Sequence, residues 1–231
     1  MIARREALRP FRGERWPVRA HVALRWATSP VAEVVESVPE GGHLLEVGCG
    51  HGLYGLAALR DRIDRLTGVD PDERKIAVAR RAAADSDATF RVGSVDVVDA
   101  SESFDAVLVV DVLYLIPEME QRAWLEAVAE RVAPGGVLVI KEMRTDRRLK
   151  LAWTRAQEWA ATRVVRVTEG GREGFRFRSP SEIENWLEEL GFGVDARSLD
   201  RWSPWPHQLV VARRSGSRPE PDRSEPVEER R

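Results

Sequence analysis

The sequence of 231 residues contains one cysteine, no long hydrophobic run and almost no net charge. A single cysteine, Cys49, excludes a disulfide within the chain and a cysteine cluster for structural zinc, and it fits a reducing cytoplasm. The longest apolar run, Ala106 to Val110, is far shorter than the roughly 20 residues of a membrane-spanning helix. The first 25 residues hold seven arginines and no apolar stretch, which argues against a secretory signal.

Charge is balanced overall but uneven along the chain. The net charge of −2 provides no global field that would attract nucleic acid. Residues 1–25 carry seven arginines against two acids, and residues 144–178 carry ten arginines or lysines against four acids. Both stretches also contain tryptophan. Arginine and tryptophan together could bind an anionic or aromatic acceptor or contact a membrane surface. The alternative is that the tryptophans belong to the core and the arginines to a solvated face.

The middle of the chain alternates between strand and helix patterns. With 43% hydrophobic residues, the length suits one α/β domain. Short connections between alternating strands and helices predict a parallel sheet covered by helices on both faces. After residue 142 the pattern predicts a long helix over 146–166, a helix that begins at Ser179, and two final strands. Strands are predicted at 43–47, 66–69, 89–92, 106–110, 137–140, 194–199 and 208–212.

A glycine-rich turn follows the first predicted strand. Glu46 lies inside that strand, and glycines at positions 48, 50 and 52 allow a sharp turn and close approach of a ligand to the backbone. The helix that follows offers free N–H groups suited to a carboxylate. Gly50-x-Gly52-x-x-Gly55 also satisfies the dinucleotide fingerprint, so NAD is an alternative ligand. An acid within the strand and the helix–strand–strand ending argue against NAD.

The same segment resembles a known family. Residues 44–56 (LLEVGCGHGLYGL) are similar to motif I of the class I methyltransferases that use S-adenosylmethionine (SAM). The similarity spans about residues 30–213, and further matches follow in order at Val69-Asp70, Gly93-Ser94-Val95, Phe104–Val107 and Pro134-Gly135-Gly136. The resemblance implies a three-layer, Rossmann-like α/β sandwich with a seven-stranded, mostly parallel sheet whose last strand is antiparallel. It also implies SAM as cofactor, S-adenosylhomocysteine as product, and no metal.

The resemblance divides the chain into three parts. Residues 1–29 form a basic N-terminal segment that would cover the acceptor site. Residues 30–213 form the methyltransferase domain, in which 143–178 are a helical insertion near the acceptor site. Residues 214–231 are rich in Pro, Ser and charge, with almost nothing to bury, which predicts a disordered tail.

Family roles can be transferred to matching positions. Glu46 would contact the glycine turn and the methionine amino group, while Gly48, Gly50 and Gly52 would pass under the methionine and ribose. Asp70 ends a strand 18 residues after Gly52, where a carboxylate can accept both ribose hydroxyls. The alternative for Asp70 is a helix N-cap.

The loop after the third strand, Ser94 and Val95, would flank the adenine. Many relatives have Asp where this chain has Ser94, and Asp96 could substitute for it. Cys49 is interpreted as a small, tightly fitting residue rather than a nucleophile, and His51 is expected to point away from the site. The remaining expected cofactor-binding residues are Pro71, Asp111 and Val112.

The end of the fourth strand, Asp111 to Tyr114, faces the transferred methyl in this family. The Asn/Asp-Pro-Pro-aromatic motif of enzymes that methylate base amino groups is missing here, which favours a small-molecule or lipid-like acceptor. Tyr114 would shape the acceptor pocket or hydrogen-bond the acceptor, unless it is a core aromatic. Glu142 could be a general base, and the alternative is a surface acid paired with Arg144.

Together these observations predict a cytoplasmic SAM-dependent methyltransferase that acts by direct in-line displacement. The expected acceptor is an O or C atom of a small hydrophobic or aromatic metabolite or a lipid-like intermediate. One alternative is an RNA or protein methyltransferase that uses the basic segments, whose affinity would fall steeply with salt. Another is a SAM-binding sensor or scaffold without turnover.

Overall fold

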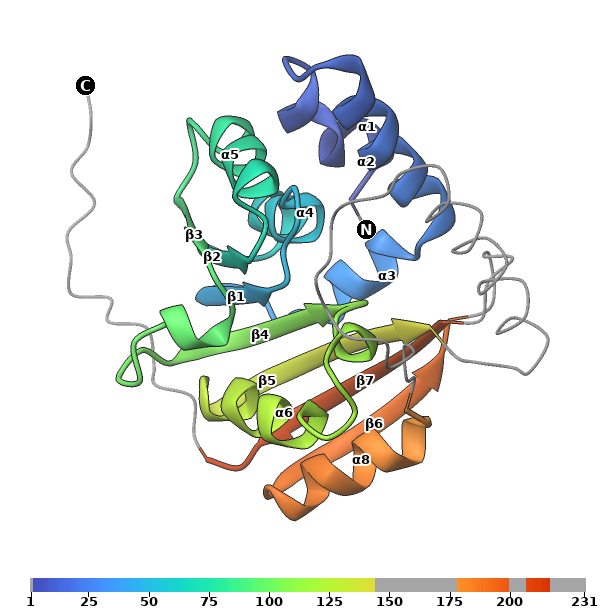
Figure 1. The fold of residues 1–231 in the computed structure, drawn as a ribbon, viewed down its shortest axis with the longest axis vertical. Coiled ribbons are helices and arrows are strands. Elements are labelled where there is room, and N and C mark those ends of the chain that lie inside the picture. Colours follow the sequence, from blue (N-terminus) through green and yellow to red (C-terminus); the bar gives the residue numbers. More distant parts are fainter. Residues whose placement is uncertain (1, 144–177, 200–206, 217–231) are drawn as a thin grey trace.

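A seven-stranded sheet forms the centre of the computed structural model, which describes residues 2–143, 178–199 and 207–216. The strand order is β3-β2-β1-β4-β5-β7-β6, and every strand except β7 runs in the same direction (Figure 1). This topology confirms the predicted fold class, including the antiparallel last strand. The strands are β1 His43–Val47, β2 Arg65–Asp70, β3 Ala88–Val92, β4 Phe104–Val110, β5 Val132–Met143, β6 Phe192–Ser198 and β7 His207–Arg214.

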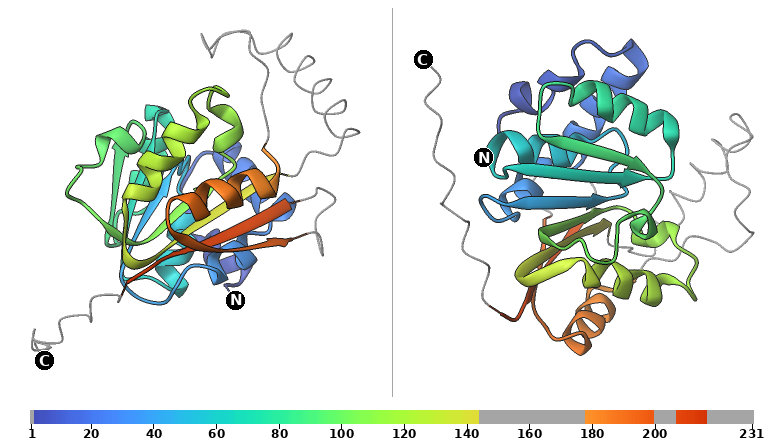
Figure 2. Two further views of the ribbon diagram at one scale, coloured as in Figure 1. Left: turned by 90° about the horizontal axis from the view of Figure 1, so that it is seen from below. Right: turned by 90° about the vertical axis from the view of Figure 1, so that its left-hand side faces the viewer.

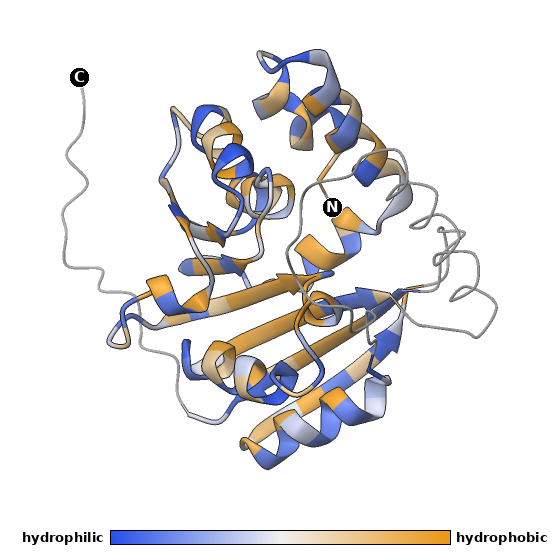
Figure 3. Ribbon diagram, in the orientation of Figure 1, coloured by the Kyte–Doolittle hydropathy of each residue, from blue (hydrophilic) through white to orange (hydrophobic). Residues whose placement is uncertain are grey.

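Helices cover both faces of the sheet (Figure 2). Strand residues alternate between two buried clusters: Leu44 packs in the cluster that contains α4, and Leu45 in the cluster that contains α6. The central strands are apolar along most of their length (Figure 3), as expected for a sheet that is buried on both sides. One face is covered by α3 Val31–Glu36, α4 Leu53–Asp61 and α5 Glu73–Ala82, and the other by α6 Gln121–Glu130 and α8 Pro180–Glu189.

Two helices begin at side-chain caps. The Asp72 carboxylate accepts hydrogen bonds from the backbone N–H groups of Arg74 and Lys75 at the start of α5. Ser179 and Glu182 form a reciprocal capping box at the start of α8, which confirms the predicted helix start. Such caps typically contribute about 1 kcal/mol each.

The N-terminal segment contains a short helix and a 3-10 turn that the sequence did not predict, followed by a helix that the sequence predicted from about residue 18. It forms α1 Arg4–Ala7, a 3-10 turn η1 Arg9–Phe11 and the longer helix α2 Trp16–Thr28. The side chain of Phe11 is only 1% exposed, so this segment is packed into the core rather than appended to it. The pattern of apolar residues over 18–37 predicts helix with a break at Thr28-Ser29-Pro30, and the structure confirms that break, because α2 ends just before Pro30 and α3 begins just after it.

Strand β5 begins earlier than predicted. Val132 pairs with Phe104, yet the next register pair joins Ala106 to Val137, so the Pro-Gly-Gly segment forms an irregularity within the strand. Gly135 has φ +73°, a left-handed conformation that glycine adopts without strain. The predicted helix over 146–166 and most of the predicted tail lie outside the described residues.

Candidate active site

The glycine-rich turn lies at the carboxyl edge of the sheet, between β1 and α4. Gly48, Gly50 and Gly52 have φ of +76°, +55° and +82°, which are left-handed conformations that favour glycine. A Cβ on Gly48 would lie 2.3 Å from Cγ2 of Val112, so this glycine lets the end of β4 approach the turn. The backbone N–H of Gly48 donates to the carbonyl of Val69 at 2.8 Å, which ties the turn to β2.

Glu46 lies beneath this turn and is 2% exposed. Its Oε2 accepts a 2.9 Å hydrogen bond from the backbone N–H of Gly55 in α4. A Cβ on Gly55 would lie 2.5 Å from the same oxygen, so the third glycine of the motif makes room for the carboxyl group. Burial raises the pKa of Glu46 to about 8. An ammonium group brought beside it would favour its charged form.

Asp70 ends β2 and is 6% exposed. Its Oδ2 accepts from the Gly50 N–H at 2.8 Å, and its Oδ1 accepts from the Asp72 N–H at 2.9 Å. Asp72 is the N-cap of α5, so the alternative that Asp70 caps this helix is wrong. A carboxylate offers about four lone-pair sites, which leaves Asp70 with capacity for two hydroxyl donors.

Ser94 and Cys49 both line the same site. The Ser94 hydroxyl accepts from Nε1 of Trp124 at 3.3 Å, and its backbone N–H donates to Asp96 at 3.1 Å. One carboxylate oxygen of Asp96 is therefore already hydrogen-bonded within this turn, and the other is the one that could substitute for the Asp of many relatives. Burial raises the pKa of the Cys49 thiol, which keeps it protonated. This state is that of a packing residue and not of a nucleophile.

A cavity of about 1010 Å³ extends over the glycine turn and along the carboxyl edge of the sheet. Helix α2 contributes one wall of it, and the ends of β2 and β4 contribute others. The cavity brings together the predicted residues Glu46, Gly48, Cys49, Gly50, Asp70, Pro71, Ser94, Asp111, Val112 and Tyr114. The predicted residues Gly52, Val95 and Glu142 do not line it. The binding roles of all these residues stay predictions.

An ion cluster at the end of β4 was missed by the sequence analysis. Nζ of Lys141 lies 2.8 Å from both carboxylate oxygens of Asp111. Arg25 of α2 donates to the same carboxylate through one terminal nitrogen. Asp111 has φ +56°, which is uncommon for a residue other than glycine. The available signal was Lys141 itself, since a lysine directly after a predicted buried strand requires a counter-ion if it is buried as well.

Glu142 follows Lys141 and anchors the segment after β4. Its Oε1 accepts from the backbone N–H groups of Val112 and Leu113 at 3.1 and 2.8 Å. The residue is 4% exposed, so the alternative of a surface acid is wrong. Burial raises the pKa of Glu142 to about 8. Tyr114, which does line the cavity, has a pKa raised by burial.

His51 faces the cavity, contrary to the expectation that it points away. Its ring centroid lies 4.9 Å from that of His21 on α2, and both residues line the cavity. Burial lowers the pKa of both imidazoles. The two rings form a contact between α2 and the glycine turn, a pairing between distant segments that sequence spacing does not reveal.

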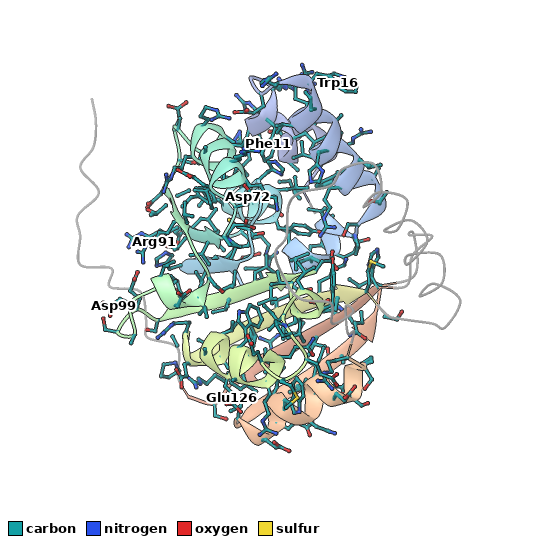
Figure 4. The ribbon with its side chains drawn as sticks, viewed as in Figure 1. Phe11, Trp16, Asp72, Arg91, Asp99 and Glu126 are labelled. Carbon is teal, nitrogen blue, oxygen red and sulfur yellow. The ribbon has the colours of Figure 1, made fainter. Side chains whose placement is uncertain are left out.

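The tryptophans of the N-terminal segment have different environments. Trp16 is 77% exposed and points away from the molecule (Figure 4), whereas Trp26 packs against the core. Within the described ranges, no helix combines the length and apolar character needed to cross a bilayer. Trp153 and Trp159 lie outside the described residues.

Comparisons with known proteins agree with this architecture. A family model described as a methyltransferase domain matches residues 18–196. The ubiquinone biosynthesis O-methyltransferase of Sinorhizobium medicae is 31% identical over 178 residues, 75% of this chain and 69% of that protein. The enzyme of the same name from Xanthomonas axonopodis pv. citri is 28% identical, over 77% of this chain and 73% of that protein.

Solved structures show the same fold at low identity. Magnesium protoporphyrin IX methyltransferase from Synechocystis PCC 6803, with bound S-adenosylhomocysteine, has a TM-score of 0.62 and 18% identity, covering 90% of this chain and 92% of that one. An O-methyltransferase family protein from Burkholderia thailandensis has a TM-score of 0.63 and 20% identity, covering 91% and 63%.

The residues present fit SAM. The nearest atom to a Cβ built on Gly50 would be 3.9 Å away, so the space over the turn is open to a ligand. Glu46 and Asp70 supply carboxyl groups suited to an ammonium and to vicinal hydroxyls, and the N-terminus of α4 suits a carboxylate. The volume is at the upper end for small-molecule sites, typically about 300–1,000 Å³. The chain belongs to the class I SAM-dependent methyltransferases.

Proposed function

We propose that this chain methylates a hydroxyl oxygen of a small molecule that has an apolar or aromatic body. The observation that carries the proposal is the continuity of the cavity: the glycine turn and an apolar wall after β4 line the same space. That wall contains Val112, Leu115 and Ile116, with Tyr114 among them. The names of the curated relatives support oxygen as the methylated atom.

In this proposal the cofactor occupies the part of the cavity between β1 and β2. Glu46 binds the methionine ammonium, Asp70 accepts the ribose hydroxyls, and Ser94 flanks the adenine, while the buried Val95 supports the loop behind it. SAM, when bound, supplies an electrophilic methyl group. The glycine turn supports this assignment because it leaves backbone open to a ligand at Gly50.

The task of the remaining residues is to hold the acceptor. Holding two reactants close and aligned can lower a barrier by roughly 7–11 kcal/mol, so an obligatory protein base is not required. The oxygen–methyl bond forms as the sulfur–methyl bond breaks, and the hydroxyl proton is released to solvent. Tyr114 would orient the acceptor. Glu142 would act indirectly, because its hydrogen bonds fix the backbone at Val112 and Leu113, next to the acceptor wall.

Calorimetry with SAM, S-adenosylhomocysteine and NAD tests the cofactor assignment. A mass-spectrometric screen of catechols and other phenols with methyl-labelled SAM tests the transfer. Binding of both adenosyl ligands, with a methylated phenol as product, would support the proposal. Labelling of RNA or protein that weakens steeply with salt would favour the macromolecular alternative. Adenosyl binding without transfer to any of these acceptors would favour a sensor or scaffold.

A further inference from the structure

The acceptor end of the cavity carries more positive than negative charge. Two cations, Arg25 and Lys141, share the single carboxylate of Asp111. Both oxygens of Asp111 lie 2.8 Å from Nζ of Lys141, which is the geometry of an ammonium donating to a carboxylate. The Lys141 side chain is 0% exposed and that of Asp111 is 4% exposed, so water screens this pair weakly.

The neighbouring acid does not supply the missing negative charge. Glu142 is buried, and its hydrogen bonds come from backbone N–H groups and not from a cation. Burial raises the pKa of Glu142 to about 8, so its neutral form dominates at pH 7. Burial lowers the pKa of Lys141, and its two 2.8 Å contacts with the Asp111 carboxylate oppose that shift. With Lys141 protonated, the cluster of Arg25, Asp111 and Lys141 carries a net charge of about +1.

Arg25 is the part of this cluster that a ligand can reach. Its side chain is 35% exposed and lines the cavity, whereas Lys141 does not. One terminal nitrogen donates to Asp111, and the described residues provide no other hydrogen-bond acceptor for this guanidinium. A guanidinium has five N–H donors, so an edge of Arg25 remains for an anionic oxygen.

Glu46 of β1 and His21 of α2 also line the cavity and interact electrostatically with Arg25, and five further charged residues lie on the far side of β1. Asp70, Asp72, Glu73, Arg74 and Lys75 come from the end of β2 and the start of α5, and strand order places β2 and β4 on opposite sides of β1. Near Arg25 the wall is formed instead by apolar residues, including Val22, Val110 and Val112. A ligand at this end would therefore pair one anionic group with an apolar body.

We propose that Arg25 binds an anionic oxygen of the acceptor, so that the acceptor is a small apolar acid bearing a carboxylate or an ionised phenol. This inference rests on the proposed function and narrows its substrate class. An anionic acceptor also matches the charge of the site, because the cofactor adds a positive sulfonium to a region that already carries excess positive charge.

The test is calorimetry on the full chain saturated with S-adenosylhomocysteine, with benzoate, 4-nitrophenolate and benzamide as probes. Benzamide is a neutral analogue of benzoate with a similar shape. We expect at least one anion to bind about 10- to 100-fold more tightly than benzamide, the effect of one charge-assisted hydrogen bond. A preference for benzoate alone identifies a carboxylate, and a preference for nitrophenolate alone identifies a phenolate.

Two variants separate this role from general charge and packing effects. Arg25→Met should abolish the preference for the anion, and Arg25→Lys should retain part of it. Arg19→Met is the matched control, because Arg19 is an exposed arginine of the same helix. The proposal is overturned if anions bind no better than benzamide, if both methionine variants behave alike, or if Arg25→Met weakens S-adenosylhomocysteine as much as benzoate. Failure of the parent chain to bind S-adenosylhomocysteine would instead refute the proposed function.

Discussion

Replacing Lys141 by methionine tests whether the ion cluster at the end of β4 stabilises the fold. Methionine keeps most of the apolar length of lysine but removes the charge that neutralises Asp111. Removing one partner of a buried ion pair typically costs about 3–5 kcal/mol, because the other charge stays buried without compensation. Arg25 still contacts Asp111 in this variant, which places the expected loss near the lower limit, about 3 kcal/mol.

Urea unfolding measures this loss directly, and thermal unfolding provides a second readout. For a chain of this size, 1 kcal/mol shifts the melting temperature by about 2–4 °C, so we expect a decrease of about 6–12 °C. Asp111→Asn in the Lys141→Met background should recover part of the stability, because asparagine removes the uncompensated charge and tolerates a left-handed φ.

A surface ion pair provides the matched control. Arg122 contacts Glu126 and Glu189 with its side chain 49% exposed, so Arg122→Met should cost less than about 1 kcal/mol. A loss below 1 kcal/mol for Lys141→Met, or a double variant less stable than the single one, would refute the view that Lys141 compensates a buried charge.

Three further predictions concern the glycine turn and its acids. Asp70→Ala should weaken SAM binding about 100-fold, because two charge-assisted hydrogen bonds to the ribose are lost, and an unchanged affinity in calorimetry would contradict the assignment. Gly48→Ala should destabilise the fold by about 2–4 kcal/mol, since its φ is +76° and the new Cβ would meet Val112; Val112→Ala should restore part of this in urea unfolding. Burial raises the folded-state pKa of Glu46 to about 8, so the ligand-free protein should lose stability as the pH rises from about 5 through 8. Glu142 has a similarly raised pKa, so Glu46→Gln should reduce that dependence without removing it, and an identical pH profile for both proteins would exclude Glu46 as a source.

The parts of the fold that follow local patterns were predicted from the sequence. The ends of β1 and β2 could be predicted because β1 is followed by Gly48 and β2 ends at Asp70, and both residue types commonly end a strand. Of the N-terminal helices, α2 and α3 follow the predicted helical pattern, whereas α1 and η1 were missed because Phe11 is buried against distant elements and no local periodicity indicates that contact. The start of β5 was misplaced because a Pro-Gly-Gly segment usually ends a strand, whereas here the pairing with β4 shifts around it.

In the candidate site too, residues that belong to a local motif were predicted, whereas residues that meet only in the folded chain were not. Glu46, Gly50 and Asp70 were found because a short motif contains them or because their spacing from it is typical. The partners of Asp111 lie 86 residues before it and 30 residues after it, and only the tertiary fold brings them together. In the sequence, Lys141 only ends an apolar strand pattern. The three-dimensional structure shows that Asp111 is its counter-ion. Residues that act through long-range charge pairing are therefore the ones that sequence reasoning omits.

The third glycine of the motif distinguishes the two cofactor interpretations physically. Gly50-x-Gly52-x-x-Gly55 fits a dinucleotide site as well, yet here a Cβ on Gly55 would lie 2.5 Å from Oε2 of Glu46 and 2.7 Å from a methyl group of Leu66. Gly55→Ala should therefore destabilise the protein by about 2–3 kcal/mol through overpacking, and it should displace the Glu46 carboxyl group.

In a Glu46→Ala background the same glycine substitution should cost less, because the carboxyl oxygen is gone and only the contact with Leu66 remains. We expect a coupling energy of about 1 kcal/mol between the two positions in a double-mutant cycle followed by urea unfolding. Additive effects would mean that Gly55 is required only for packing of α4 on β2. Coupling would mean that this glycine makes room for a buried acid, which a dinucleotide site does not need.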